Sequence, residues 1–411
     1  MARVRTGIWL IGAKGGVAST ATVGLIALKK GLIPSAGLVS ELPQFQDIGL
    51  AAWRDFTIGG HEIREVRSFD EAWRMHAESR AIDPGLLTKC KGDLDKLDKQ
   101  IRTGTLLNVG STIECLAGPA ARGHSESQRE AIERVQDDLK TFAAEQRLDH
   151  VIVVNVASTE PATDAAILPD RWSELNKLID KPRRCPLPAS SLYAIAALDL
   201  GCSYINFTPS LGSAAPAIDE LARERGARHM GHDGKTGETL LKSVLAPMFA
   251  KRNLPVMSWV GHNIFGNMDA KVLDDPANKQ AKVTSKDRLL GQILGYTPQT
   301  LVSIERIESM GDWKTAWDHV HFSGFLGTPM TFQFIWQGCD SLLAAPLVLD
   351  LVRFTERAWR AGEVGLLKFL CSFFKSPQGV AEHNFGVQFQ MLEAWAAGLK
   401  ATQSAAQVPR R

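Results

Sequence analysis

The chain of 411 residues lacks several features that would assign it to familiar classes of protein. Its six cysteines form no CxxC pair, which argues against a zinc knuckle or a disulfide framework and favours free thiols. No apolar run reaches the length of a membrane span; residues 342–352 come closest, and Asp350 interrupts them. The formal net charge is only +2, so nothing global favours nucleic acid or an anionic membrane. We therefore expect a cytoplasmic protein without a nucleic-acid or membrane partner.

Buried strands alternate with helices through the first 239 residues. The pattern predicts strands at 7–11, 151–155 and 202–207, and helices at 21–30, 70–80, 127–147 and 192–198. Residues 83–104 are polar and lysine-rich and show no clear core face. This alternation is typical of a doubly wound α/β domain with a parallel sheet.

The sequence changes character after residue 239. Strands are predicted at 255–261 and 299–307, further strands are expected in the aromatic-rich segment 313–336, and helical sequence returns at 342–360. We predict two domains, as the length allows. The first is a Rossmann-type doubly wound domain formed by residues 1–239 and 344–411, and the second is an inserted α+β domain of residues 240–343.

A glycine-rich turn, Gly12 to Thr20, lies between the first predicted strand and helix. Glycines let the backbone approach a pyrophosphate, and the helix N-terminus offers free N–H groups, so the turn predicts a bound dinucleotide. The alternative is an ordinary tight turn, because Lys14 takes the place of the second glycine in G-x-G-x-x-G. Glu41 and Glu62 are both candidates for the acid that would bind the ribose.

Several lysines and polar turns of the second half are typical of anion chemistry. Thr236, Gly237 and Thr239 precede a predicted helix and fit an oxyanion such as a sugar phosphate, although spacing alone slightly favours a simple N-cap by Thr236. Lys282 and Lys286 would share one helical face, either at an anion or in solvent.

Lys375 follows the apolar run 369–374, which would disfavour its charged form and suit proton transfer, unless it extends to the surface. His319 and His321 would face one side of a strand. Metal binding is the lesser interpretation for them, since no third ligand is recognisable.

These segments, in this order and spacing, resemble the myo-inositol-1-phosphate synthase family, also called inositol-3-phosphate synthases, over nearly the whole chain. The N-terminal likeness consists of the glycine turn, Gly59-Gly60-His61-Glu62-Ile63, Ala157-Ser158-Thr159-Glu160 and the strand from Cys202 to Asn206. The stronger likeness is C-terminal: Gly231 to Ser243 resembles Gly-Asp-Asp-x-Lys-Ser-Gly-Gln-Thr, followed by Gly266-Asn267-Met268-Asp269, Lys282 with Lys286, Gly311-Asp312-Trp313-Lys314, Asp340 to Leu347, and Lys375-Ser376-Pro377.

The resemblance implies a tightly bound, recycled NAD and assigns site residues. The implied catalytic residues are Lys282, Lys314, Lys375, Asp340, Asp233, Asn267 and Asp269. The implied NAD contacts are Gly12, Ala13, Gly15, Gly16, Val17, Ala18, Glu62 (in preference to Glu41), Ala157, Thr159, Asp233 and Asp340. The implied phosphate site contains Lys235, Thr236, Gly237, Glu238, Thr239 and Lys286.

The reaction implied by the resemblance is the cyclisation of D-glucose 6-phosphate to myo-inositol (1- or 3-) phosphate, an isomerisation. NAD oxidises C5, C6 loses a proton, the enolate attacks the C1 aldehyde, and C5 is reduced again. An alkoxide, an enolate and an aldol alkoxide form in turn, which explains why preorganised lysines suit the chemistry. The resemblance also implies a homotetramer assembled through the inserted domain, and leaves open the use of a monovalent or divalent cation.

Three departures from the family pattern stand beside the expected site: His232 for the first aspartate, Glu238 for the glutamine and Met268 for the second asparagine. Glu238 should weaken phosphate binding unless Lys235 or a cation offsets its charge. The alternatives are therefore an NAD-dependent sugar-phosphate dehydrogenase without cyclisation, or a divergent homologue with another substrate or lost activity.

Overall fold

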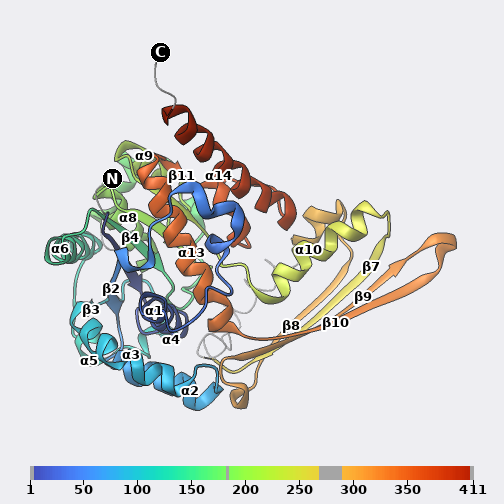
Figure 1. Cartoon of the computed structure of the whole chain (residues 1–411), viewed down its shortest axis with the longest axis horizontal. Helices are drawn as coiled ribbons and strands as arrows, with labels where there is room; N and C mark the ends of the chain where they lie inside the picture. Colours follow the sequence, from blue (N-terminus) through green and yellow to red (C-terminus); the bar gives the residue numbers. More distant parts are fainter. Residues whose placement is uncertain (1–3, 182–184, 268–288, 408–411) are drawn as a thin grey trace.

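A seven-stranded parallel sheet forms the centre of the larger part of the molecule (Figure 1). The computed structural model describes residues 4–181, 185–267 and 289–407, with side chains up to residue 401. The sheet has the order β11-β6-β5-β4-β1-β2-β3. Its strands are β1 (Thr6–Ile11), β2 (Phe56–Glu62), β3 (Ile101–Thr103), β4 (His150–Asn155), β5 (Ser203–Asn206), β6 (Arg228–Gly231) and β11 (Gly365–Leu366). The order reverses between β1 and β4, which is where a Rossmann fold binds its dinucleotide.

Helices cover both faces of this sheet, so its central strands are buried and apolar. One face packs on α6 (Gln128–Gln146), α7 (Trp172–Ile179), α8 (Ala189–Asp199) and α9 (Pro216–Glu224). The other packs on α1 (Gly16–Lys29), α13 (Asp340–Arg360) and α14 (Phe385–Gln407). The predicted Rossmann architecture is confirmed. The first helix begins at Gly16 rather than Ala21, because Gly15 is its N-cap and the end of the glycine turn, from Gly16 to Thr20, is already helical.

The segment in which no element was predicted contains a helix, α3 (Pro84–Leu97), which follows α2 (Ser68–Ser79). Asp83 accepts a hydrogen bond from the N–H of Leu86, and Pro84 occupies the first helical position. Leu87, Cys90 and Leu94 are buried at helical spacing. Cys90 completes an apolar stripe that the lysines around it obscure in the sequence.

The remaining elements of this body are short. They are α4 (Ser111–Glu114), α5 (Pro119–Arg122) and 3-10 turns at 39–41, 43–48, 53–55, 98–100, 165–167 and 368–373; the 3-10 turns at 308–310 and 325–327 connect strands of a second sheet. Within the described ranges, the helices are all too short or too polar to cross a lipid bilayer.

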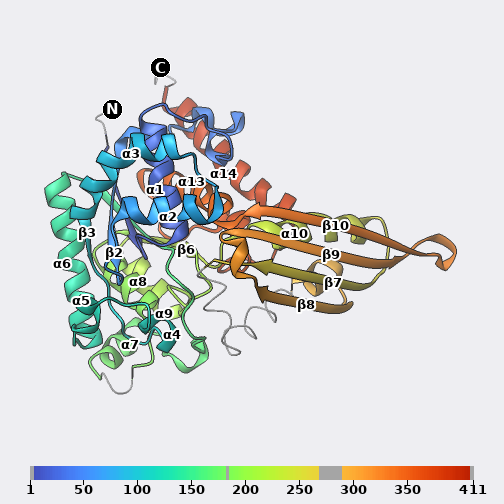
Figure 2. The ribbon, with the colours of Figure 1, turned by 90° about the horizontal axis from the view of Figure 1, so that it is seen from below.

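A second, four-stranded sheet extends away from the α/β body (Figure 2). Its order is β10-β9-β7-β8, formed by β7 (Val256–Phe265), β8 (Gln299–Arg306), β9 (Trp313–Ser323) and β10 (Pro329–Cys339). The strands predicted in this region are confirmed. Helix α10 (Gly237–Lys251) packs Ala246 and Phe249 against Trp259 and Val320 on the inner face of this sheet. The outer face is not covered by any described helix.

Candidate active site

A cavity of about 700 Å³ lies where the two sheets meet. On one side it is lined by the carboxyl ends of β1, β2 and β4, including Gly12, Glu62 and Asn155. On the other side it is lined by the inner face of the small sheet, including Asn263 and Lys314. The cavity therefore joins the switch point of the Rossmann sheet to a polar wall contributed by the second sheet.

Four helices, α1, α8, α10 and α13, direct their N-termini to this cavity. In two of them, an N–H group of the first turn already donates a hydrogen bond to a carboxylate of the protein. Glu160 accepts the N–H of Ser190 in the first turn of α8 at 2.8 Å, and Asp312 accepts the N–H of Ser341 in α13 at 2.8 Å. Helices α1 and α10 have no side-chain cap. Since free helix N-termini favour anions, these two ends suit anionic groups of a ligand.

The glycine turn fits a dinucleotide closely. Gly12 has φ 76°, and a Cβ there would lie 2.8 Å from the Cα of Ala157, so the two backbones need a glycine at this crossing. Lys14 does not obstruct the approach to the turn, because its ammonium bonds the carbonyl of Val66 and the carboxylate of Asp98. Gly15, Gly16 and Val17 line the cavity, whereas the side chains of Ala13 and Ala18 pack in the core.

The two candidate ribose acids lie in different surroundings. Glu62 ends β2, lines the cavity and accepts the backbone N–H of Lys14 at 2.8 Å. Glu41 instead bonds the indole of Trp53 and pairs with Arg353 of α13 at 2.5 Å. The position at the carboxyl end of β2 favours Glu62.

Glu160 is a buried acid whose ionisation couples to stability. Burial raises the pKa of its carboxyl from 4.5 to about 7, although Ser190 and Ser210 bond it. Because the folded state binds this proton more tightly than the unfolded chain, stability is present at low pH and is lost as the pH rises from 4.5 to 7. We expect Glu160→Gln to leave the free energy of unfolding near that of the wild type at pH 5. At pH 8 the variant should gain up to about 3 kcal/mol over the wild type.

Urea unfolding of both proteins at the two pH values measures this difference. Glu130→Gln is the matched control, because Glu130 is a solvent-exposed capping residue of α6. The same stability difference between Glu160→Gln and the wild type at pH 5 and at pH 8 would contradict the assignment.

The expected catalytic groups that the structure describes gather at the far end of the cavity. The ammonium of Lys375 donates to the carboxylate of Asp233 at 2.8 Å, and the backbone N–H of Lys375 bonds the carbonyl of Asp233. Asp340, the first residue of α13, also lines the cavity. The apolar run before Lys375 packs in the core, so its ammonium faces an acid and the cavity rather than apolar side chains.

Lys314 lies on the inner face of the small sheet. Its ammonium lies 4.8 Å from the centre of the Phe265 ring. Phe265 pairs in register with Lys314 on one side and with Arg306 on the other. Directly paired residues share one face of a sheet, so both cations border the cavity. Arg306 was not predicted as a site residue; its position one residue before the end of the predicted strand 299–307 is the only sequence signal that could have indicated it.

Asp312 connects the elements that carry these groups. Its carboxylate accepts from the N–H and hydroxyl of Ser341, from the thiol of Cys339 and from the amide of Asn267. Its own N–H bonds the hydroxyl of Ser79 at the end of α2. Burial raises the pKa of Asp312, while the bonds to Cys339, Ser341 and Asn267 oppose that rise. Asn267 thus serves this network as well as lining the cavity.

The expected phosphate residues divide into two groups. Thr236, Glu238 and Thr239 line the cavity at the start of α10, next to Gly237 with φ 58°. Lys235 was expected near the phosphate, and the structure corrects this. Its ammonium is buried against α14 and bonds the side-chain carbonyl of Gln388, and burial lowers its pKa to about 8. The extended turn before α10 points consecutive side chains in opposite directions, and Lys235 is on the side away from the cavity.

Glu238 is neutralised by a residue that was not predicted. Lys242, one turn further along α10, pairs with Glu238 at 2.6 Å and lies 3.8 Å from Asp318 of β9. The three side chains are 2%, 1% and 0% exposed, in the order Glu238, Lys242, Asp318. A Cβ on Gly261 would lie 2.6 Å from the Glu238 carboxylate, so this strand needs a glycine to admit the cluster. Spacing of four residues between Glu238 and Lys242 is the signal that could have indicated the pair.

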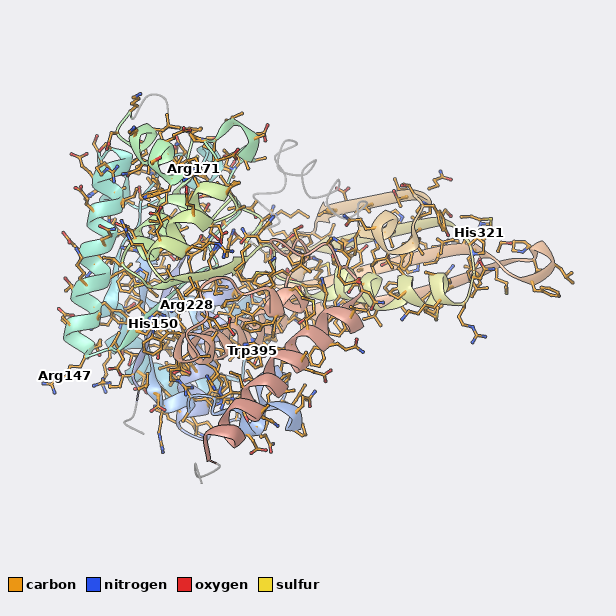
Figure 3. All side chains as sticks on the ribbon, turned by 90° about the horizontal axis from the view of Figure 1, so that it is seen from above. Arg147, His150, Arg171, Arg228, His321 and Trp395 are labelled. Carbon is orange, nitrogen blue, oxygen red and sulfur yellow. The ribbon has the colours of Figure 1, made fainter. Side chains whose placement is uncertain are left out.

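Met268, Asp269, Lys282 and Lys286 lie outside the described residues, so their predicted roles stay predictions. Asn263 was not predicted; its amide is fully buried, lines the cavity and has no hydrogen-bond partner among the described residues. The described ranges contain no group of three or more His, Cys, Asp or Glu side chains arranged to hold a metal ion. His321 lies far out along the small sheet, toward the hairpin tip (Figure 3).

The strand order, the open α1 N-terminus at the switch point and the cavity lysines define a dinucleotide-dependent enzyme of the Rossmann class. Residues 6–397 match the family model described as myo-inositol-1-phosphate synthase. The chain belongs to this family, as the resemblance predicted.

Individual relatives agree over nearly the whole chain. Inositol-3-phosphate synthase 1 of Bacteroides thetaiotaomicron is 30% identical over 434 aligned positions, covering 95% of this chain and 94% of that protein. The crystal structure of inositol-3-phosphate synthase from Caenorhabditis elegans superposes with a TM-score of 0.85 at 25% identity, covering 97% of this chain and 86% of that one. A myo-inositol-1-phosphate synthase-related protein from Thermotoga maritima gives 0.75 at 26%, covering 96% and 98%.

Proposed function

We propose that this chain cyclises D-glucose 6-phosphate to myo-inositol (1- or 3-) phosphate, with NAD bound throughout and regenerated in each turnover. The observation that carries the proposal is the single cavity. It places the open N-terminus of α1, the open N-terminus of α10 and the ammonium groups of Lys314 and Lys375 around one space. Membership of the inositol phosphate synthase family supports the same reaction.

The residues of the chain fit NAD at the switch point. The turn from Gly12 to Val17 would hold the pyrophosphate, and Glu62 would bind the ribose. Ala157 and Thr159 would contact the dinucleotide from the opposite wall of its site, since these residues line the same side of the cavity. When bound there, NAD would supply reversible hydride transfer at C5 of the sugar. The protein's task is to orient the sugar against it and to move protons.

The ion pair of Lys375 and Asp233 supplies the proton transfer at the C5 hydroxyl, with Asp340 beside it. Lys314 stabilises negative charge that develops on oxygen during the aldol step. Thr236, Gly237 and Thr239 bind the phosphate at the start of α10, where Lys242 neutralises Glu238. From the sequence alone, Lys282 is proposed at the oxyanions, Lys286 at the phosphate, and Asp269 beside them.

The test measures inositol phosphate and NADH in the same reaction. The full-length protein is incubated with glucose 6-phosphate and NAD+, inositol phosphate is followed by NMR, and NADH is followed by absorbance. Inositol phosphate without net NADH is expected. Stoichiometric NADH would replace the proposal by a sugar-phosphate dehydrogenase, and the absence of both would indicate another substrate or a lost activity.

We also propose that residues 240–343 act as an inserted unit through which a homotetramer assembles, in a cytoplasmic location. Support comes from the outer face of the small sheet, where Ile335, Trp317 and His262 form one row across three strands. Ile335 is 71% exposed, and exposed apolar patches of this kind mark protein contacts.

We expect Ile335→Glu to lower the particle mass measured by light scattering. Gln337→Glu, exposed on the same strand face, is the control for added charge alone. A tetramer that persists unchanged in Ile335→Glu would remove this face from the interface.

A monovalent or divalent cation at the phosphate remains part of the proposal. The support is the charge balance beside the proposed phosphate site, where the carboxylates of Glu238 and Asp318 share the ammonium of Lys242 and Glu238 lines the cavity. Turnover after exhaustive chelation, with ammonium, potassium or magnesium added back singly, decides whether a cation assists.

A further inference from the structure

The corner of the cavity beyond β2 contains an arginine two residues after the proposed ribose acid. The guanidinium of Arg64 lies 3.3 Å from both carboxylate oxygens of Glu62 and donates to the carbonyl of Lys14 at 2.6 Å. Its third nitrogen lies 3.5 Å from Glu71. Arg64 and Glu62 both line the cavity. An arginine at this position is the group that binds the 2′-phosphate in NADP enzymes, whereas an acid binds the free 2′-hydroxyl of NAD.

Glu62 is held firmly in place. Its carboxylate accepts the backbone N–H groups of Lys14 at 2.8 Å, Ile63 at 2.9 Å and Arg64 at 3.1 Å. These donors come from the β1 turn and from the end of β2, so the acid cannot swing aside without losing several bonds. A 2′-phosphate placed here would meet a fixed negative charge.

Glu62 is the main charged partner of Arg64, ahead of Glu71. Glu71 is already bonded by Arg74, whose Nε lies 2.9 Å from it, and Arg74 also pairs with Glu78. The bonds from Arg64 to Glu62 are longer than the 2.7–2.9 Å typical of charge-assisted pairs. Without the Glu62 charge, the guanidinium would keep the Lys14 carbonyl and have donors left for a planar, bidentate acceptor.

We infer that Glu62 and Arg64 together select NAD over NADP. Arg64 is able to bind a 2′-phosphate, but its guanidinium is paired with the Glu62 carboxylate instead. The inference rests on the proposed function only in placing the adenosine ribose beyond β2. It assigns Arg64 a role that the reaction itself does not require. Loss of the Glu62 carboxylate would then convert the NAD site into one that accepts NADP, because the cation needed for the 2′-phosphate, Arg64, is already present.

The experiment measures binding without any sugar phosphate, so an inactive enzyme does not affect it. The full-length protein is equilibrated with equal concentrations of NAD+ and NADP+, and the dinucleotide retained is separated by chromatography and quantified. The wild type should retain NAD almost exclusively. Glu62→Gln, which preserves an oxygen acceptor for the backbone N–H groups, should shift the bound ratio toward NADP by about tenfold or more. Glu62→Ser is the second variant, in case the amide distorts the turn.

Two variants separate the role of Arg64 from a general change of charge. Glu71→Gln removes the same charge from the same corner but leaves the Glu62 carboxylate, so its bound ratio should stay near that of the wild type. Arg64→Gln added to Glu62→Gln should abolish the gain in NADP. Equal NADP gains in Glu62→Gln and Glu71→Gln, or a gain that survives the loss of Arg64, would overturn the inference, as would a wild type that retains NADP.

Discussion

Replacing Lys375 by methionine is expected to lower kcat by about 10²–10⁴-fold, the usual contribution of a positioned proton-transfer group. The ammonium lies 2.8 Å from Asp233 and faces the cavity, so methionine removes the proton carrier but keeps most of the side-chain volume. Binding of NAD should persist, because the glycine turn and the α1 N-terminus lie elsewhere on the cavity wall. Steady-state kinetics with glucose 6-phosphate and a separate dinucleotide-binding assay measure the two effects.

Lys368→Met is the matched control, since Lys368 is a solvent-exposed lysine in the same C-terminal segment. It should leave kcat and stability near the wild-type values. Lys375→Arg should not restore turnover, because a guanidinium does not release its proton near neutral pH. An active Lys375→Met enzyme would remove this residue from the proton-transfer step.

The largest effect on stability is expected from Lys242→Met. This change removes the ammonium that pairs with the buried carboxylate of Glu238 and lies 3.8 Å from that of Asp318, and loss of one partner from a buried ion pair costs about 3–5 kcal/mol. The double variant Glu238→Gln with Lys242→Met also removes the carboxylate charge of Glu238, so it should recover part of the lost free energy of unfolding. Chemical denaturation of the wild type, the single variants Glu238→Gln and Lys242→Met, and the double variant forms a double-mutant cycle that isolates the pair.

Lys251→Met, at the exposed end of the same helix, controls for the loss of a lysine from α10. One outcome of these measurements would contradict the expected role of Lys242. If Lys242→Met is as stable as Lys251→Met, the cluster does not depend on its cation, and Glu238 must be neutralised in another way.

The sequence predicted the Rossmann half well because its signals are local. A strand, a glycine turn and a helix follow one another within residues 6–29, and each is specified by its own residues. The amphipathic helix α6 was predicted almost to its ends from apolar residues at helical spacing, and the structure adds a capping box of Ser127 and Glu130 at its start. The family was predicted from motifs that are likewise contiguous in sequence.

The rest could not be predicted because it depends on contacts between distant segments. Lys235 is within the predicted phosphate motif, yet its ammonium bonds Gln388, which is 153 positions away. The Glu238–Lys242 pair becomes a buried cluster only because Asp318 approaches from β9. The helix α3 was missed because its buried stripe includes Cys90 among many lysines.

The four helix N-termini around the cavity have a consequence for inhibition. Glu160 and Asp312 already satisfy α8 and α13, so among the described residues only α1 and α10 are left for anions from solution. Each of the two would then accept one kind of competitor. Inorganic phosphate should compete with the sugar phosphate at α10, and pyrophosphate with the dinucleotide at α1. The pattern of product and anion inhibition is thus already set by which helix N-termini bind a carboxylate from another segment of the protein.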